Sequence, residues 1–510
     1  MVAIVNSMGL FGLDAFEIKT EADISTGMPS FDIVGLPDVS VKESRDRVRA
    51  AMRNCGFDFP TGRIIINLAP ADIRKEGPLY DLPILMAILK SSGQISMKLD
   101  DSIFLGELSL SGELRAVNGI LPMTIKAREC GYKKIYVPAA NAFEAAVVHG
   151  IEVYAVDKLD TLFLHLSDFK KITPSVYDYE KQLTSDNLPD FSQVKGQQQA
   201  KRAMEIAAAG GHNILLIGSP GSGKSMLAKR LPSILPDMTV DEMIETTKIH
   251  SIAGALSSDA PLITHRPFRS PHHTVSAAAL SGGGSIPKPG EISLAHNGVL
   301  FLDELPEFSR AATEALRQPI EDGVVTISRV HGTLSYPCTM MVVAAMNPCP
   351  CGNFGSPVKK CICSQQAVNR YLSKVSGPLL DRLDLHIEVP PVDFNDLSSK
   401  ETGESSEQIR ARVNAARRIQ LERYKDDGII CNARLTPSLL RKYCVMDEKA
   451  ENLLKNAFER MGLSARAYDR ILKVARTIAD LDNREIIGFK HIGEAVQYRG
   501  LDEKYWSKSK

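Results

Sequence analysis

The sequence lacks any apolar run near the length of about 18 residues that a helix needs to cross a bilayer. Residues 1–16 carry no basic residue ahead of their apolar positions, and Asp14 interrupts them, which is untypical of a signal peptide. Cysteine is scarce, with nine among 510 residues, so a disulfide scaffold is excluded. These absences predict a cytoplasmic protein without a membrane segment.

The sequence also lacks net charge, because 61 lysines and arginines balance 61 aspartates and glutamates. This balance excludes a protein that coats nucleic acid through bulk positive charge, but it leaves a local basic surface open. Hydrophobic residues make up 44% and charged residues 24%, as in globular proteins. A chain of 510 residues has room for about three domains.

Three regions of different periodicity follow one another. Residues 1–165 predict a compact α+β domain, with a helix at 41–54 and buried strands at 64–68 and 134–137. Residues 166–192 are polar and aperiodic, which predicts a linker. Residues 193–395 alternate strands and helices, which predicts a parallel α/β core. Residues 396–510 are helical, with helices expected near 402–424, 436–446, 447–460, 464–481 and 488–497.

A phosphate-binding loop is the strongest motif in the chain. A buried strand at 213–217 runs into the pattern GxxxxGK followed by serine, and then into a helical segment. The loop comprises Gly218, Ser219, Pro220, Gly221, Ser222, Gly223, Lys224 and Ser225. Its backbone N–H groups would face a nucleotide's phosphates, with Lys224 at the β- and γ-phosphates and Ser225 on Mg²⁺. A chance glycine-rich turn is the alternative, which the strand–loop–helix context disfavours.

Two further strands end in polar residues. The apolar strand 298–302 is followed by Asp303 and Glu304. Asp303 would hold Mg²⁺ through water, and Glu304 would act as general base on the attacking water. The strand 339–346 ends at Asn347, which would hydrogen-bond the γ-phosphate or the attacking water. The alternatives are a solvated acidic strand end and a turn residue before Pro348. Together with the loop, these residues predict hydrolysis of ATP.

These motifs resemble those of AAA+ ATPases. The segment 196–200 fits the entry to that fold, and Asn347 matches its first sensor. Residues 377–384 resemble the trans-acting arginine finger of the branch with MCM helicases and magnesium chelatase, which implies that Arg382 enters a neighbour's ATP site. An ion pair of Arg382 with a flanking aspartate is the alternative. Residues 463–466 resemble the second sensor of these ATPases. This resemblance implies that Arg466 contacts the γ-phosphate from the helical lid, and Arg470 is the competing candidate for that role.

Two insertions interrupt the core. Residues 260–290 contain no aspartate or glutamate, and residues 322–334 are predicted to form a β-hairpin with a turn at His331–Gly332. Both resemble inserts that line the central pore of hexamers in the same AAA+ branch. Basic side chains in these inserts would contact DNA phosphates, and the alternative is ion pairs at a subunit interface. The predicted contacts are Arg266, Arg269, Lys288 and Arg329.

Over nearly its whole length the sequence resembles the ComM/YifB family. The resemblance is carried by segments 35–38, 67–72, 266–296, 347–352 and 463–481. It implies a homo-hexameric DNA motor, since ComM is understood as a hexameric helicase that drives branch migration in natural transformation. A magnesium chelatase-like or protein-remodelling ATPase without a DNA substrate is the second hypothesis, because fold does not imply function.

The first region resembles the Lon protease domain, which has the ribosomal protein S5 domain 2-like fold, through residues 106–112 and 127–141. The alignment puts Leu79 at the nucleophile and Met123 at the lysine of the Ser–Lys dyad, with Lys126 about one helical turn away. An aliphatic side chain cannot attack a carbonyl, and a thioether cannot accept the proton. We therefore expect no peptidase activity and favour a structural or oligomerisation module.

Four cysteines cluster in the pattern C-x-C-x₉-C-x-C, at Cys349, Cys351, Cys361 and Cys363. Four thiolates can bind Zn²⁺ tetrahedrally, although the common spacing is CxxC, so free thiols stay open as the alternative. We expect the other five cysteines to be buried packing residues. They are Cys55, Cys130, Cys338, Cys431 and Cys444.

Overall fold

The computed structural model of the chain describes residues 2–178, 188–257, 260–284, 287–329, 332–355, 359–392 and 403–506, without the side chains of 329, 332, 502 and 503. Contacts divide the chain into two units, the first comprising Met1–Thr184 and Met243–Thr264, the second Ser185–Glu242 and His265–Lys510. Residues 243–264, which follow the phosphate loop in sequence, thus cluster with the N-terminal unit. Helix α9 (Val240–Ala253) begins among residues of the second unit and ends among those of the first.

The first unit is built on a mixed seven-stranded sheet of order β3-β4-β2-β1-β5-β8-β9. Its strands are β1 (Ala3–Phe11), β2 (Asp14–Ser25), β3 (Ser30–Val34), β4 (Arg63–Ala69), β5 (Ser102–Phe104), β8 (Lys134–Pro138) and β9 (Glu152–Val156), and β6 (Glu107–Leu108) pairs separately with β7 (Leu114–Arg115). β1, β2 and β4 pair antiparallel, whereas β5, β8 and β9 run parallel.

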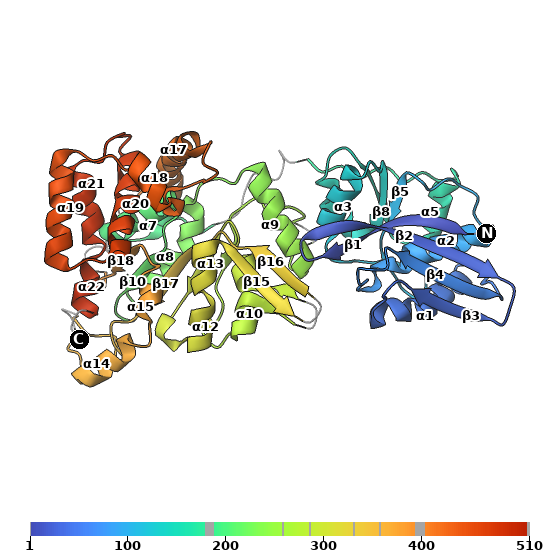
Figure 1. Ribbon diagram of the computed structural model, residues 1–510, viewed down its shortest axis with the longest axis horizontal. Coiled ribbons are helices and arrows are strands. Elements are labelled where there is room, and N and C mark those ends of the chain that lie inside the picture. Colours follow the sequence, from blue (N-terminus) through green and yellow to red (C-terminus); the bar gives the residue numbers. More distant parts are fainter. Residues whose placement is uncertain are drawn as a thin grey trace. The chain divides into compact units, whose positions relative to one another are not determined.

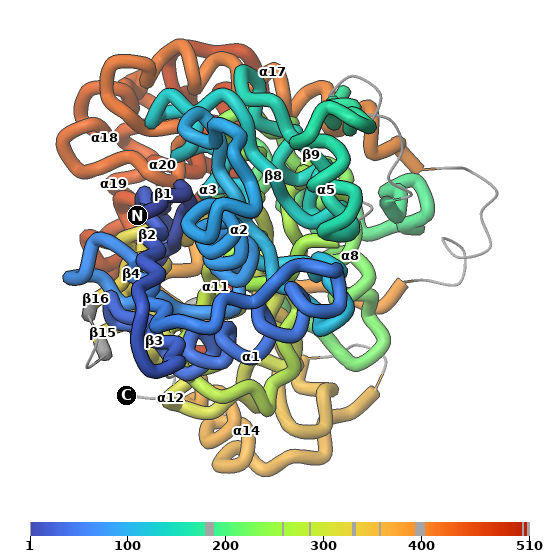
Figure 2. The backbone as a smooth tube through the Cα atoms, turned by 90° about the vertical axis from the view of Figure 1, so that its right-hand side faces the viewer, coloured from blue at the N-terminus to red at the C-terminus, as the bar shows by residue number. Residues whose placement is uncertain are grey.

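The helices of this unit are α1 (Val39–Asn54), α2 (Asp81–Ser91), α3 (Ile120–Glu129), α4 (Ala142–Ala146) and α5 (Leu159–Leu166). Helices α2 and α3 pack against β1 and β2 (Figure 2). Asp38 caps α1 by accepting a hydrogen bond from Val41 N at 2.7 Å, and the apolar face of α1 is buried. The predicted helix at 41–54 and the strands at 64–68 and 134–137 are confirmed.

The second unit contains a five-stranded parallel sheet of order β11-β14-β17-β10-β18. The strands are β11 (Phe268–Arg269), β14 (Val299–Leu302), β17 (Met341–Met346), β10 (Ile214–Ile217) and β18 (Leu385–Glu388). All residues of β10, β14 and β17 are buried, as expected of strands covered on both faces. Because the strands are parallel, their carboxyl ends meet at one edge, where α/β folds bind ligands.

The second unit also contains helices and two short hairpins that are separate from this sheet. The helices are α7 (Gln198–Gly210), α8 (Lys224–Arg230), α10 (Ala277–Ser281), α11 (Glu291–Leu294), α12 (Arg310–Ala315), α13 (Arg317–Asp322), α14 (Gln365–Leu372) and α15 (Gly377–Leu380). β12 (Gly282–Gly283) pairs with β13 (Lys288–Pro289), and β15 (Val324–Arg329) with β16 (Gly332–Pro337). The predicted hairpin is confirmed, but Gly332 pairs with Arg329 as a strand residue, so its place in the predicted turn was wrong. His331 lies outside the described residues.

Helices gather at the C-terminal end of the second unit (Figure 1). They are α17 (Ser406–Tyr424), α18 (Pro437–Tyr443), α19 (Glu448–Met461), α20 (Ala465–Leu481), α21 (Phe489–Gln497) and α22 (Gly500–Tyr505). The five predicted helices are confirmed, with ends that differ by a few residues, whereas α22 was not predicted. Pro437 opens α18 directly after Thr436, where a proline needs no N–H partner.

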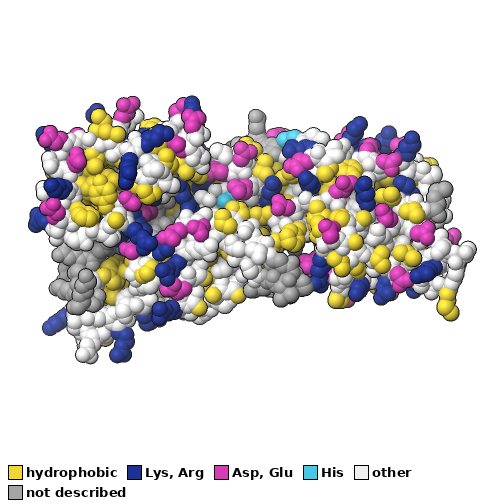
Figure 3. Space-filling view, in the orientation of Figure 1, with side chains coloured by type: hydrophobic (Ala, Val, Ile, Leu, Met, Phe, Trp, Pro, Cys, Tyr) yellow, Lys and Arg dark blue, Asp and Glu magenta, His cyan; other side chains and the backbone are white. Residues whose placement is uncertain are grey.

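No helix among the described residues is long and apolar enough to cross a membrane. On the face drawn in Figure 3, acidic and basic side chains lie interspersed rather than in fields of one sign. The zero net charge of the sequence therefore does not hide a large basic surface on that face.

Candidate active site

The phosphate-binding loop connects β10 to α8, as predicted. Gly223 sits at a φ of 91°, a conformation that side chains disfavour, directly before the helix. The Lys224 ammonium lies inside the loop and donates hydrogen bonds to the carbonyls of Gly218 at 2.7 Å and Ser219 at 2.9 Å. Burial lowers the pKa of Lys224, and the charge of Asp303 opposes that shift.

The ends of the neighbouring strands bring the other predicted residues to this loop. Ser225 Oγ donates to Asp303 Oδ2 at 2.6 Å, across from the end of β14. Asn347 follows β17, and its Oδ1 accepts a hydrogen bond from Lys224 Nζ at 3.2 Å. A hydroxyl and a carboxylate side by side are the oxygen donors that Mg²⁺ prefers, so these residues fit a magnesium ion bound with a nucleotide.

Glu304 follows Asp303 in an unusual backbone conformation. Its φ of 54° places a non-glycine residue in the left-handed region, which is a strained conformation typical of functional sites. More than half of its side chain is exposed, so the carboxylate is accessible to a water molecule. Nδ1 of His273 lies 3.5 Å from Glu304 Oε2.

Two residues at this site were not predicted. His273 was visible in the sequence as one of a histidine pair after β11, but nothing there indicated that it meets Glu304. Gln197 precedes α7 and donates to the carbonyl of Ser222 within the phosphate loop, at 2.5 Å. It lies within the segment 196–200 that fits the AAA+ entry.

The arginines assigned to the finger and the second sensor converge elsewhere in the second unit. Arg382, Arg466 and Arg470 line one cavity of about 320 Å³, together with Arg434 and Lys473. Among the described lining residues none belongs to the phosphate loop. Burial lowers the pKa of both Arg470 and Lys473, and the negative charge of Asp384 opposes that shift.

The individual arginines differ in how firmly they are held. Arg382 is nearly buried, pairs with Glu321 at 2.6 Å and donates to two backbone carbonyls. Its partner is therefore neither Asp381 nor Asp384, the flanking aspartates considered from the sequence. Arg466 is largely exposed, 4.0 Å from Asp381. Arg470 lies 3.5 Å from Asp384, and its Nη1 has no hydrogen-bond partner among the described residues.

Two of the four basic residues predicted to touch DNA are engaged within the chain. Arg266 forms two hydrogen bonds with Glu242, at 3.0 and 3.1 Å, and Arg269 forms two with Glu291, both at 2.7 Å. Glu291 directly follows the acid-free stretch of sequence, and Glu242 precedes it in α9. Lys288 is exposed at the edge of β13, and the side chain of Arg329 lies outside the described residues.

The four clustered cysteines come together in space. Their ligand atoms all lie within 4.8 Å of one another. Three of the sulfur pairs are 3.4, 3.6 and 3.7 Å apart. Zinc bonded to four sulfurs at about 2.3 Å spaces them about 3.8 Å apart, whereas a disulfide needs about 2.05 Å. The donors therefore fit a tetrahedral metal ion.

The other five cysteines only partly match their predicted role. Cys338, Cys431 and Cys444 are buried, but Cys55 is half-buried and Cys130 is exposed. The prediction of a packing role for Cys130 was wrong, because α3 ends at Glu129 and leaves the next residue at the surface.

In the first unit, the positions aligned with a catalytic dyad are apolar and buried. Leu79 precedes α2, and Met123 lies within α3. Lys126 faces outward and pairs with Glu129 at 3.4 Å.

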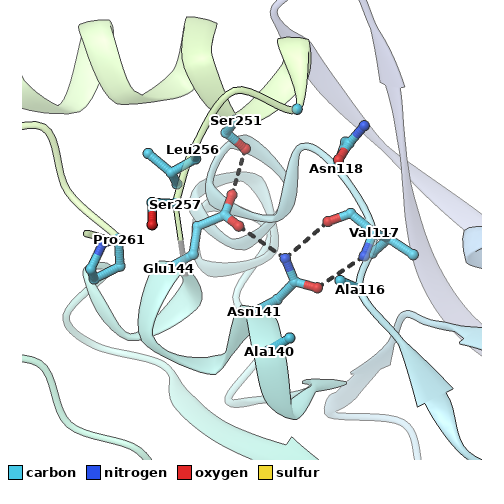
Figure 4. Close-up of a pocket in the computed structure, with 11 residues that line it drawn as sticks. Ala116, Val117, Asn118, Ala140, Asn141, Glu144, Ser251, Leu256, Ser257 and Pro261 are labelled. Atoms are coloured by element: carbon cyan, nitrogen blue, oxygen red, sulfur yellow. Dashed lines mark hydrogen bonds between the residues drawn. The ribbon is translucent and has the colours of Figure 1, made fainter. Parts of the chain in front are cut away.

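A small polar cavity of about 130 Å³ in this unit is lined by Glu144, Asn141 and Ser251 (Figure 4). Glu144 accepts hydrogen bonds from Ser251 Oγ at 2.5 Å, Leu121 N at 2.9 Å and Asn141 Nδ2 at 3.1 Å. Burial raises the pKa of Glu144. The hydrogen bond from Ser251 joins the last turn of α9 to the rest of the first unit.

The phosphate loop, the acidic pair and the asparagine that follows β17 lie at one edge of a parallel sheet, which defines a P-loop nucleotide-binding protein. The family model "Magnesium chelatase, subunit ChlI" matches residues 190–397. "Subunit ChlI of Mg-chelatase" matches 20–141, and "Magnesium chelatase, subunit ChlI C-terminal" matches 403–499.

Two full-length relatives narrow this class. The chain is 44% identical over 504 residues to the "Uncharacterized protein YifB" of Escherichia coli (strain K12), covering 98% of this chain and 97% of that protein. It is 44% identical over 509 residues to the "Competence protein ComM" of Haemophilus influenzae, covering 98% of each. The chain therefore belongs to the ComM/YifB family of AAA+ proteins. The similarity to the "Magnesium-chelatase 67 kDa subunit" of Chlorobaculum tepidum is 26% over 164 residues, 31% of this chain and 23% of that protein.

Proposed function

We propose that the protein is an ATP-hydrolysing DNA motor that works as a homo-hexameric ring, in the manner of a helicase or branch-migration enzyme. One observation carries the proposal. The residues that would bind and cleave ATP meet at one edge of the parallel sheet, while three candidate γ-phosphate arginines line a separate cavity. A second copy of the chain would bring the two together, which is the head-to-tail arrangement of rings.

Within one subunit, the phosphate loop would hold the nucleotide and Lys224 would neutralise its β- and γ-phosphates. Ser225 and Asp303 would hold Mg²⁺, which supplies positive charge to the transferred phosphoryl group when it is bound. Glu304 would accept a proton from the attacking water, and Asn347 would orient that water or the γ-phosphate. Lys224 already contacts Asn347, so these roles require little rearrangement.

The arginines would act on the nucleotide of the neighbouring subunit. Arg382 would serve as the finger, because its guanidinium is held by Glu321 and by backbone carbonyls at a fixed place in the cavity. Arg466 is the more exposed sensor and Arg470 the more enclosed one. A positive charge aimed at the transferred phosphate is worth about 10³–10⁵ in rate in related chemistry.

The family and the basic insertions support the proposal of a DNA partner. A relative named for competence supports a role in the uptake or recombination of DNA. We keep Lys288 and Arg329 as the proposed phosphate contacts. We place Arg266 and Arg269 in structural ion pairs, because their guanidinium groups are engaged by Glu242 and Glu291.

The Lys288→Ala variant tests the role of this lysine. We expect DNA binding to weaken several-fold, and the slope of log K against log salt to fall by about 0.7–0.9 for each phosphate that the protein no longer neutralises. The matched control is Lys449→Ala, which removes an exposed lysine from α19. Equal affinity and equal salt dependence of both variants, measured with forked DNA in the presence of ATP, would refute the assignment of Lys288.

The remaining parts of the proposal concern domain boundaries and compartment. We propose a Lon-like domain at 1–165 without peptidase activity, a linker at 166–192, an AAA+ core at 193–395 and a helical lid at 396–510, in a cytoplasmic protein. The burial of the apolar side chains of Leu79 and Met123 supports the absence of peptidase activity. The second hypothesis, a chelatase-type or protein-remodelling ATPase, draws on the partial similarity to a magnesium chelatase subunit.

We also propose that Cys349, Cys351, Cys361 and Cys363 bind one zinc ion. The sulfur spacing supports this proposal, since it is close to the spacing around a tetrahedral zinc ion.

A further inference from the structure

The segment that carries the first two clustered cysteines runs along the phosphate-binding loop. At its start, Asn347 contacts Lys224. At its end, Gly352 lies so close to Pro220 that an added Cβ would come within 2.2 Å of the proline Cδ. Cys349 and Cys351 stand between these two contacts. The metal ligands are therefore built into the strip of chain that borders the nucleotide site.

Two prolines and a tight turn restrict the backbone of this strip. Pro348 and Pro350 fix the backbone on either side of Cys349. The amide of Gly352 donates to the carbonyl of Cys349 at 2.9 Å, which closes a tight turn. Thiol contacts join this turn to Cys361. Thiols are weak hydrogen-bonding groups, whereas a metal–thiolate bond would fix the turn in place.

We propose that zinc bound to the four cysteines holds Gly352 against Pro220 and thereby sets the affinity of the phosphate loop for ATP. This inference rests on the proposed ATP and zinc sites. Pro220 belongs to the loop whose N–H groups would bind the phosphates. Such hydrogen bonds need donor–acceptor distances of about 2.7–3.2 Å, so a small displacement of the loop weakens several of them together.

Removal of the metal is the first test, performed on the full-length wild-type protein under reducing conditions. We expect one zinc per chain by elemental analysis. After treatment with a zinc-selective chelator, we expect affinity for a fluorescent ATP analogue to fall at least tenfold, with Mg²⁺ kept in excess. Added Zn²⁺ should restore the affinity, and further Mg²⁺ should not.

A substitution that leaves the cysteines intact is the second test. Gly352→Ala should retain its zinc and bind ATP at least tenfold more weakly, because its Cβ strikes Pro220. Gly355→Ala is the matched control, since Gly355 has nearly the same φ, 75° against 76°, and an added Cβ there meets nothing closer than Lys504 at 3.6 Å. Zinc content and ATP affinity of this control should stay within twofold of wild type.

The double variant Pro220→Ala, Gly352→Ala separates the contact from general damage to the turn. If the clash is responsible, its ATP affinity should return to that of Pro220→Ala alone. If the purified protein contains no zinc, or contains iron instead of zinc, the proposed zinc site is wrong and the proposal fails. Zinc without any effect of its removal on ATP affinity overturns the coupling and leaves the proposed function standing. Failure of the wild-type protein to bind ATP overturns both.

Discussion

Replacing Glu304 by glutamine is expected to lower the rate of ATP hydrolysis by about 10²–10⁴-fold while ATP binding persists. The amide keeps the size and the exposed position of the side chain but cannot accept a proton from water. Lys224, Ser225 and Asp303 stay in place, so the nucleotide remains bound and the ring should be stabilised in its ATP-bound form. Single-turnover hydrolysis and equilibrium binding of the same nucleotide measure the two effects separately.

The matched control for this variant is Glu307→Gln. Glu307 lies three residues further on, in the same short helical turn, and pairs with Lys374 at 3.1 Å. Its substitution should leave hydrolysis within about threefold of wild type, as expected when a surface ion pair is removed. If Glu304→Gln hydrolyses ATP at the wild-type rate, another group is the base and the assignment of Glu304 is wrong.

Replacing Arg382 by alanine is expected to lower hydrolysis by about 10³-fold with little loss of ATP binding. Arg382 also holds Glu321 and two carbonyls, so a loss of activity alone would not separate a finger from a structural role. Mixing experiments make that separation. In a mixed ring, an Arg382→Ala subunit keeps Lys224, and a neighbouring Lys224→Ala subunit supplies an intact Arg382.

Equal mixing of these two inactive variants should therefore restore hydrolysis, with about a quarter of the subunit interfaces complete in a random ring. Arg310→Ala is the control for the arginine variant, since Arg310 is exposed on α12. Its activity should match wild type. If the mixture stays inactive although native mass spectrometry shows mixed rings, Arg382 does not act on a neighbour's nucleotide.

The sequence predicted the residues at strand ends well because their positions follow from local rules. A parallel sheet sends the carboxyl ends of its strands to one edge, so Lys224, Asp303 and Asn347 had to lie near one another once the strands were recognised. The helices of the C-terminal region were found for a similar reason, since amphipathic periodicity and caps such as Ser464 are local signals.

Contacts between distant segments could not be predicted in this way. The stretch 260–290 is free of acids in sequence, yet Arg266 and Arg269 find Glu242 and Glu291 across its borders. His273 approaches Glu304 only because β11 and β14 are neighbours in the sheet. The clustering of residues 243–264 with the first unit likewise depends on tertiary contacts, including the hydrogen bond between Ser251 and Glu144.

The most direct test of the central claim is the steady-state rate of ATP hydrolysis with and without forked or four-way-junction DNA, using Lys224→Ala as the blank. Lysine at the β- and γ-phosphates is required for turnover, so the blank should be inactive under both conditions. A DNA motor predicts that the wild-type rate rises several-fold with DNA and saturates as DNA is added. A rate that is unchanged at saturating DNA, in a protein that hydrolyses ATP and assembles into rings, would contradict the proposal of a DNA motor.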